Sequence, residues 1–173
     1  MKTIYPVEWP QFFTATILEW KHLLQNNAYK EIIIASLRFL VYQERIKLFA
    51  FVIMSNHIHL VWQMLPPFSR EQVQQSFMKF TAQQIKFDLQ KNNPALLERF
   101  HVNAKDRSFQ FWERNSLTVD LFSPIVLNQK LDYIHNNPVK AGICDLPENY
   151  YYSSASYYRS GVDHFNMLSH FNG

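Results

Sequence analysis

The sequence predicts an α+β fold in which helices cover one face of an antiparallel sheet, and three observations support this. Short segments rich in aromatic and β-branched residues alternate with segments of helical periodicity. The chain has 173 residues, a length that suits one domain with an ordinary core. Its 47% hydrophobic and 18% charged residues are typical of a chain that folds by itself. We expect residues 1–173 to form one domain, with a core at about 12–143 and a C-terminal extension at 144–173.

The first half of the chain predicts a strand, a helix and a hairpin. Aromatic and β-branched residues over 12–20 favour a strand. Apolar residues then recur at the spacing of an amphipathic helix between residues 26 and 45. The short apolar run 48–54 is typical of a central strand, and the alternating segment 57–63 follows it after a polar dipeptide. These last two segments therefore predict an antiparallel hairpin.

The second half predicts two further helices and a strand. Ser69 and Gln72 have the spacing of a capping box, which begins a second long helix. Its apolar residues follow at roughly helical spacing: Val73, Phe77, Phe80 and Phe87. Composition becomes strand-like again over 109–120. Ser123 and Pro124 then begin a third helix, with serine at the N-cap and proline at the first helical position.

This order of elements is that of a ferredoxin-like domain, a split βαβ arrangement followed by an extra C-terminal helix. The tail from Asn149 shows no periodic element, with tyrosines scattered among serines. It is either packed on the domain or a binding extension.

Composition excludes several classes of function. Only three glycines occur, too few for a Gly-rich phosphate loop or a dinucleotide fingerprint, so we expect no nucleotide cofactor. The single cysteine, Cys144, excludes a disulfide framework and a multi-cysteine zinc site. Residues Met1–Pro6 lack the apolar stretch of a signal peptide, and no apolar run approaches the ~20 residues of a membrane span. We expect a cytoplasmic protein without membrane contact, whose net charge of +3 permits a polyanionic partner.

His57 and His59 stand two positions apart on a predicted strand, so both side chains project from one face. Their Cα atoms would lie roughly 7 Å apart, close enough for both rings to reach one divalent cation. The opposite face, with Ile58, Leu60 and Trp62, supplies the buried side and leaves both imidazoles on the open face. The alternative is one hydrogen-bonded core histidine and one solvated histidine.

The third helix brings a second group of polar side chains together. Its core stripe has the spacing i, i+4, i+7: Leu127, Leu131 and Ile134. Tyr133 lies off that stripe and shares a polar face with Lys130 and Asn137. A hydroxyl, an ammonium and an amide therefore converge. The alternative is a half-exposed tyrosine that packs its ring and hydrates its hydroxyl.

Asn137 and His135 each have a structural alternative as well. Asn137 precedes Pro138 in a stretch that ends at Gly142, so it can cap a short helix instead of binding a metal. Because a residue before proline disfavours helical backbone, its alignment with Tyr133 is approximate. His135 points to a different face, where we expect a solvated or capping histidine.

Two segments of the sequence, taken in this order, resemble the motifs of a known protein family. Met54–Val61 holds the His-hydrophobic-His strand, and Tyr133–Gly142 reads Tyr-Ile-His-x-Asn-Pro-Val-Lys-Ala-Gly. Together they resemble the HUH single-tyrosine transposases, closest to the REP-associated tyrosine transposase branch, over about residues 12–158. The family commonly has proline where Ser55 stands, and many relatives have glutamine where Asn137 stands, with an arm one methylene longer.

The resemblance implies a mechanism and a site. His57, His59 and the amide of Asn137 would hold Mg²⁺ or Mn²⁺, and imidazole ligands suit Mn²⁺ better. Tyr133 would attack the scissile phosphate of single-stranded DNA, leaving a 5′-phosphotyrosine link and a free 3′-hydroxyl. The branch typically acts on short imperfect palindromes folded as hairpins. A non-catalytic hairpin DNA or RNA-binding module, and a metal-dependent phosphodiesterase, are the alternatives.

Substrate binding would need a basic groove that also carries aromatic side chains. The candidates by position near the site are Arg107, Trp112, Arg114, Lys130 and Lys140. Each of these residues alone is more often a surface or core residue. The expected partner is single-stranded or hairpin DNA, bound by a monomer or a homodimer, with Tyr133 acting within its own chain or on a second copy.

Overall fold

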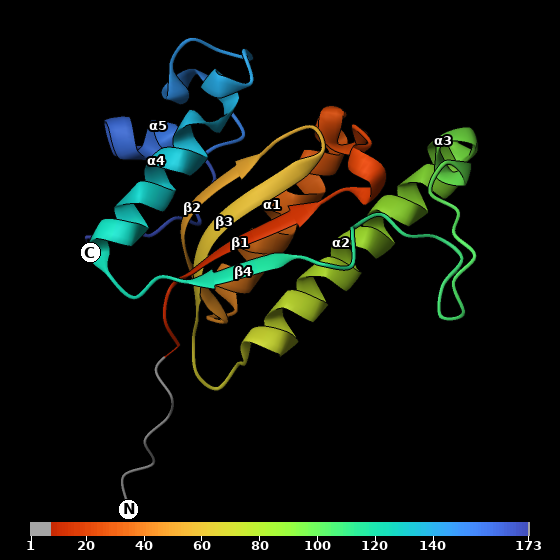
Figure 1. The fold of residues 1–173 in the computed structure, drawn as a ribbon, viewed down its shortest axis with the longest axis horizontal. Coiled ribbons are helices and arrows are strands. Elements are labelled where there is room, and N and C mark those ends of the chain that lie inside the picture. Colours follow the sequence, from red (N-terminus) through yellow and green to blue (C-terminus); the bar gives the residue numbers. More distant parts are fainter. Residues whose placement is uncertain (1–7, 173) are drawn as a thin grey trace, which may run out of the picture.

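The computed structural model describes residues 8–172, and Met1–Pro6 of the sequence-based prediction lies outside them. Four antiparallel strands form one sheet in the order β2-β3-β1-β4 (Figure 1). Their bounds are β1 Gln11–Thr16, β2 Ile46–Ile53, β3 His57–Met64 and β4 Leu117–Asp120. The predicted hairpin is confirmed, because β2 and β3 pair directly.

Two crossovers produce the split βαβ arrangement. Helix α1 (Asn27–Tyr42) joins β1 to β2, with β3 inserted between those strands. Helices α2 (Arg70–Asn92) and α3 (Pro94–Glu98) join β3 to β4, with β1 between them. Side chains of α1 and α2 share one hydrophobic core with the sheet. The ferredoxin-like α+β prediction is confirmed.

Helix α4 (Pro124–Lys140) covers the opposite face of the sheet (Figure 1). Along β3, Ile58, Leu60 and Trp62 pack toward α1 and α2, as the alternation predicts, but Val61 is buried toward α4. The expectation of an open face for both imidazoles is therefore wrong: His59 is only 5% exposed. The sequence pattern could not show which face the third helix would cover.

The C-terminal segment is packed against the outer edge of the sheet. It contains the short helices η3 (Pro147–Asn149) and α5 (Ala155–Ser160), which the sequence did not predict. Backbone hydrogen bonds attach it to the edge strand β2: Ile53 N donates to Tyr152 O, and Ser169 N to Leu48 O. The edge of β2 is thereby paired instead of being left open.

Three elements differ from the sequence-based expectation. The strand predicted over 12–20 ends at Thr16, and 3₁₀ turns follow at Leu18–Trp20 (η1) and Leu23–Gln25 (η2). Only the last four residues of 109–120 form a strand. In α2 the buried stripe runs at i+4 spacing through Val73, Phe77, Thr81, Ile85 and Leu89. Phe80 and Phe87 lie off that stripe and are exposed.

No helix among residues 8–172 combines the length and the apolarity that crossing a membrane requires.

Candidate active site

His57 and His59 stand at the start of β3 with their Nδ1 atoms already hydrogen-bonded. Nδ1 of His59 lies 2.7 Å from Oγ1 of its cross-strand partner Thr14. Nδ1 of His57 lies 2.7 Å from Oδ1 of Asn56, and an amide oxygen only accepts, so His57 carries its proton on Nδ1. The centroids of the His57 and His59 rings are 4.8 Å apart. Such outer hydrogen bonds are typical of imidazoles that bind metals through Nε2.

Both imidazoles are neutral at neutral pH. Burial lowers the pKa of His59 to about 3, and electrostatic interaction with Lys130 and with the protonated form of His57 acts in the same direction. Burial also lowers the pKa of His57. A neutral imidazole keeps a lone pair on one nitrogen, which is the form that coordinates a cation.

Tyr133 of α4 lies beside His59 of the same chain. The two ring centroids are 5.3 Å apart, and Phe12 of β1 contacts both rings at 5.3 Å from His59 and 5.9 Å from Tyr133. Leu131 and Ile134 fix the helix on the sheet, which holds Tyr133 at the border of the buried stripe with 44% of its surface exposed. The fold thus brings together two histidines and a tyrosine from distant strings of the sequence.

Two lysines of α4 flank the tyrosine. Nζ of Lys130 lies 4.6 Å from the centroid of the Phe12 ring and 5.7 Å from that of Tyr133. Nζ of Lys140 lies 5.9 Å from the Tyr133 centroid. Two positive charges therefore stand beside the hydroxyl-bearing ring, where they favour the approach of an anion.

Asn137 lies inside α4, one turn beyond Tyr133, and not at the start of a new helix. The interpretation of Asn137 as an N-cap is wrong. Proline fixes φ at a helical value and removes only one amide donor, so Pro138 is accommodated in the last turn of α4. Gly142, with φ of +73°, follows the C-cap of the helix. Helical spacing keeps Asn137 on the face of Tyr133, with a half-buried side chain.

His135 packs against the C-terminal segment, whereas a solvated or capping histidine was expected at this position. Its Nε2 lies 2.8 Å from Oγ of Ser154, and its ring lies 5.2 Å from that of Tyr158. Burial lowers the pKa of His135 to about 4. It joins α4 to the C-terminal segment, away from the Tyr133 face.

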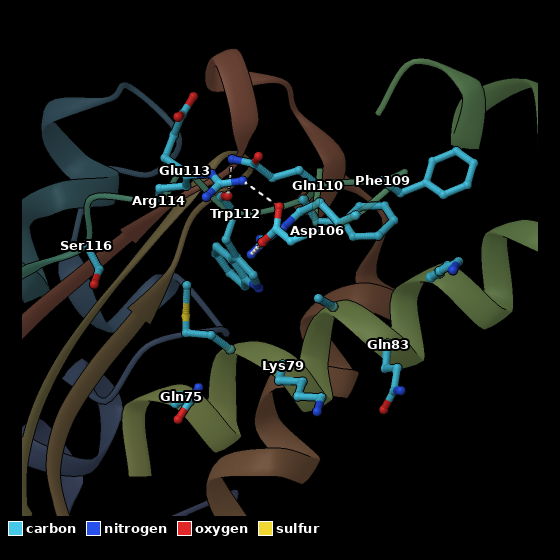
Figure 2. A pocket seen from close by; sticks show the side chains of 15 residues that line it. Gln75, Lys79, Gln83, Asp106, Phe109, Gln110, Trp112, Glu113, Arg114 and Ser116 are labelled. Carbon is cyan, nitrogen blue, oxygen red and sulfur yellow. Dashed lines mark hydrogen bonds and ion pairs between the residues drawn. The ribbon is translucent and has the colours of Figure 1, made fainter. Parts of the chain in front are cut away.

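The other three predicted DNA-binding residues line a pocket on the α2 side of the sheet (Figure 2). This pocket, of about 650 Å³, lies between α2 and residues 106–116. Arg107 and Arg114 both pair with Asp106, at 2.9 and 3.0 Å, and they hold the pKa of that carboxyl at about 2. Trp112 is buried, and its Nε1 donates to Thr81 Oγ1, so it is a core residue and not an open stacking surface.

Backbone hydrogen bonds connect the pocket wall to the strands that carry the histidine pair, at the end of β1. Glu113 N, at the pocket wall, donates to Thr16 O at 2.7 Å. Thr16 is the cross-strand partner of His57. The pocket wall is thus hydrogen-bonded to the strand end that pairs with His57, while the His59 ring lies with Phe12 and Tyr133 on the opposite, α4 face of the sheet.

Sequence reasoning missed Phe12, Thr14 and Asn56, which orient the two histidines and the tyrosine. Their types gave no chemical signal, because only the register of β1 against β3 brings Thr14 opposite His59. Within residues 8–172 no group of three or more His, Cys, Asp or Glu side chains could hold a metal ion.

Comparison with solved structures finds the same fold in other proteins of known structure, including the following two. The structure of a REP-associated tyrosine transposase bound to a REP hairpin matches with a TM-score of 0.65 and 15% identity, covering 98% of this chain and 90% of that one. A protein of Deinococcus radiodurans R1, assigned as a transposase, matches with a TM-score of 0.50 and 15% identity, covering 79% and 95%. No protein-family model and no curated protein sequence matches this chain. The chain has the fold of a REP-associated tyrosine transposase, the branch that its two sequence strings resemble.

Proposed function

We propose that this chain nicks single-stranded DNA and transfers the strand through a covalent bond to Tyr133. The observation that carries the proposal is the contact of the Tyr133 ring with His59, 5.3 Å between centroids, beside the second histidine His57. A nucleophile and two metal-type ligands thus meet within one chain, which favours action of Tyr133 in cis.

The donor set fits a divalent cation, Mg²⁺ or Mn²⁺. His57 and His59 would hold it through Nε2, because hydrogen bonds occupy both Nδ1 atoms. The amide oxygen of Asn137 is the candidate third ligand, on the face of Tyr133. A cation held by these residues would polarise the scissile phosphate. Imidazole ligands favour Mn²⁺ over Mg²⁺.

The chemistry is a transesterification at phosphorus. The Tyr133 oxygen forms a bond to the phosphorus atom, the bond from phosphorus to the 3′ oxygen breaks, and that oxygen takes up a proton. The products are a 5′-phosphotyrosine and a free 3′-hydroxyl. A second 3′-hydroxyl reverses the step and rejoins a strand without a nucleotide fuel. Lys130 and Lys140, which flank the Tyr133 ring, would neutralise charge on the phosphate.

The substrate is hairpin DNA. The REP-associated transposase of the comparison is bound to a REP hairpin. In this chain the pocket beside α2 offers four basic side chains, Lys79, Lys86, Arg107 and Arg114, against the carboxyls of Asp106 and Glu113. A hairpin stem held there by its phosphates would present its single-stranded flank to the histidines.

The test is a denaturing gel after incubation with labelled hairpin oligonucleotides that carry single-stranded flanks, taken from DNA beside the gene. We expect a covalent adduct that requires Mn²⁺, disappears with chelator and is absent in Tyr133→Phe. Tyr42→Phe is the matched control, since Tyr42 is an exposed helical tyrosine on α1. Tight binding without an adduct would instead indicate a binding module. Cleavage that survives in Tyr133→Phe would indicate a metal-dependent phosphodiesterase.

A further inference from the structure

The turn after β1 places an exposed tryptophan next to the histidine pair. Trp20 is 61% exposed, and its ring centroid lies 6.0 Å from that of His57. We infer that Trp20 is a stacking platform for a nucleobase that adjoins the scissile phosphate, an inference that rests on the proposed function. The sequence suggested Trp112 as the aromatic DNA-binding residue of a basic groove, but that indole is buried.

The backbone at Trp20 has a conformation that bulky residues rarely adopt. Glu19 and Trp20 have φ of +55° and +56°, in the left-handed region. Such conformations persist where surrounding contacts enforce them, and they concentrate at functional sites. An exposed indole on a strained turn contributes little to the core, so packing does not explain the residue.

The turn is attached firmly to the segment that carries His57. Ile17 N donates to Asn56 O at 2.8 Å, and Asn56 Nδ2 donates to Trp20 O at 3.4 Å. Asn56 is also the residue that fixes the His57 ring through Oδ1. The Asn56 side chain thus contacts both the His57 ring and the backbone of Trp20, which attaches the turn to the candidate ligand.

The charges on this turn favour contact with a base and not with a phosphate. The carboxylate of Glu19 lies 3.2 Å from Nζ of Lys21, and that ammonium also donates to Arg99 O at 2.7 Å. Nδ1 of His22 is hydrogen-bonded to Oγ of Ser55, at 2.7 Å. The ring of Trp20 is therefore the contact that the turn offers to a nucleotide, and stacking on an aromatic ring tolerates any base.

The test uses 2-aminopurine, whose fluorescence is quenched on stacking, at successive positions of the single-stranded flank of the hairpin oligonucleotide. The protein carries Tyr133→Phe with Mn²⁺ present, so that no strand is cut. We expect strong quenching at one position beside the scissile phosphate, lost in Trp20→Ala and retained in Trp20→Phe. Affinity for the flanked hairpin should fall about tenfold or more in Trp20→Ala, with little change for the blunt hairpin.

Trp9→Ala is the matched control, because Trp9 is 50% exposed and precedes the end of β1 that is remote from His57. Trp20→Gly removes the ring and tolerates positive φ, so it replaces Trp20→Ala if the alanine variant unfolds. Equal quenching and affinity in the variants without a ring would overturn the inference. If quenching depends on Trp20 but the unmodified chain forms no covalent adduct, the stacking site is supported and the proposed function is contradicted.

Discussion

Thr14 and His59 face each other across β1 and β3, and the 2.7 Å contact between Oγ1 and Nδ1 is the hydrogen bond that fixes the His59 ring. The ring is 5% exposed and is stacked by Phe12, so no water replaces this partner. A threonine in the neighbouring strand therefore determines which nitrogen of a candidate metal ligand is available.

Thr14→Val should test that relationship, because valine keeps the shape of threonine and removes the hydroxyl. We expect metal-dependent adduct formation to fall about 10- to 100-fold, the usual effect of losing the outer partner of a metal-binding histidine. Higher Mn²⁺ concentrations should recover part of the rate, and Thr14→Ser should restore most of it. The measurement is the initial rate of adduct formation against Mn²⁺ concentration. An unchanged Mn²⁺ dependence in Thr14→Val would contradict the assignment.

Lys130→Met should lower the rate of adduct formation while leaving hairpin affinity nearly unchanged. Its ammonium lies beside Phe12 and Tyr133, close to where charge changes during the transfer and on the other face of the sheet from the basic pocket. We expect a loss of about tenfold, equivalent to about 1.4 kcal/mol in activation free energy. Lys47→Met, which changes an exposed lysine on β2, is the control. A parallel loss of affinity in chelator would mean that Lys130 only binds DNA.

The salt dependence of hairpin binding should report the pocket charges. Asp106 pairs with both Arg107 and Arg114, and these hold its pKa at about 2, so it stays ionised at working pH. Asp106→Asn releases both arginines, and we expect tighter binding with a steeper salt dependence. Arg114→Gln should weaken binding and reduce the slope of log Kd against log salt by about 1. Titrations at several salt concentrations would show the same affinity and the same slope in both variants as in the unmodified chain if the pocket does not contact phosphates.

Helices and strands whose ends are marked by nearby residues could be predicted from the sequence. The packing of the elements around the candidate site could be predicted only in part. The Ser69 capping box and the Ser123–Pro124 start of α4 were correct because caps act through neighbouring residues. The burial of His59 was not predictable, because it depends on the face of the sheet that α4 covers. The end of β1 at Thr16 was missed because β-favouring residues continue to Trp20, and tertiary hydrogen bonds turn the backbone instead.

Tyr150 and Tyr158 should make the free energy of unfolding fall steeply in alkali. Their hydroxyls donate to Ile53 O and Phe49 O on β2, at 2.6 and 2.8 Å. Burial raises the pKa of each to about 12, against 10 in an unfolded chain. The neutral phenols stabilise the fold fully below pH 10, and this contribution is lost as pH rises through 12, because the unfolded chain releases its protons first.

Urea unfolding followed by tryptophan fluorescence at intervals between pH 9 and 12 measures the effect. The slope of the unfolding free energy against pH measures the number of protons released on unfolding. In Tyr150→Phe this number should be smaller by up to about one, and in the Tyr150→Phe/Tyr158→Phe double variant by up to about two. Tyr29 and Tyr152, whose pKa values burial also raises, maintain part of the fall in both variants. Identical pH dependence in wild type and double variant would show that the C-terminal segment leaves β2 before these phenols ionise.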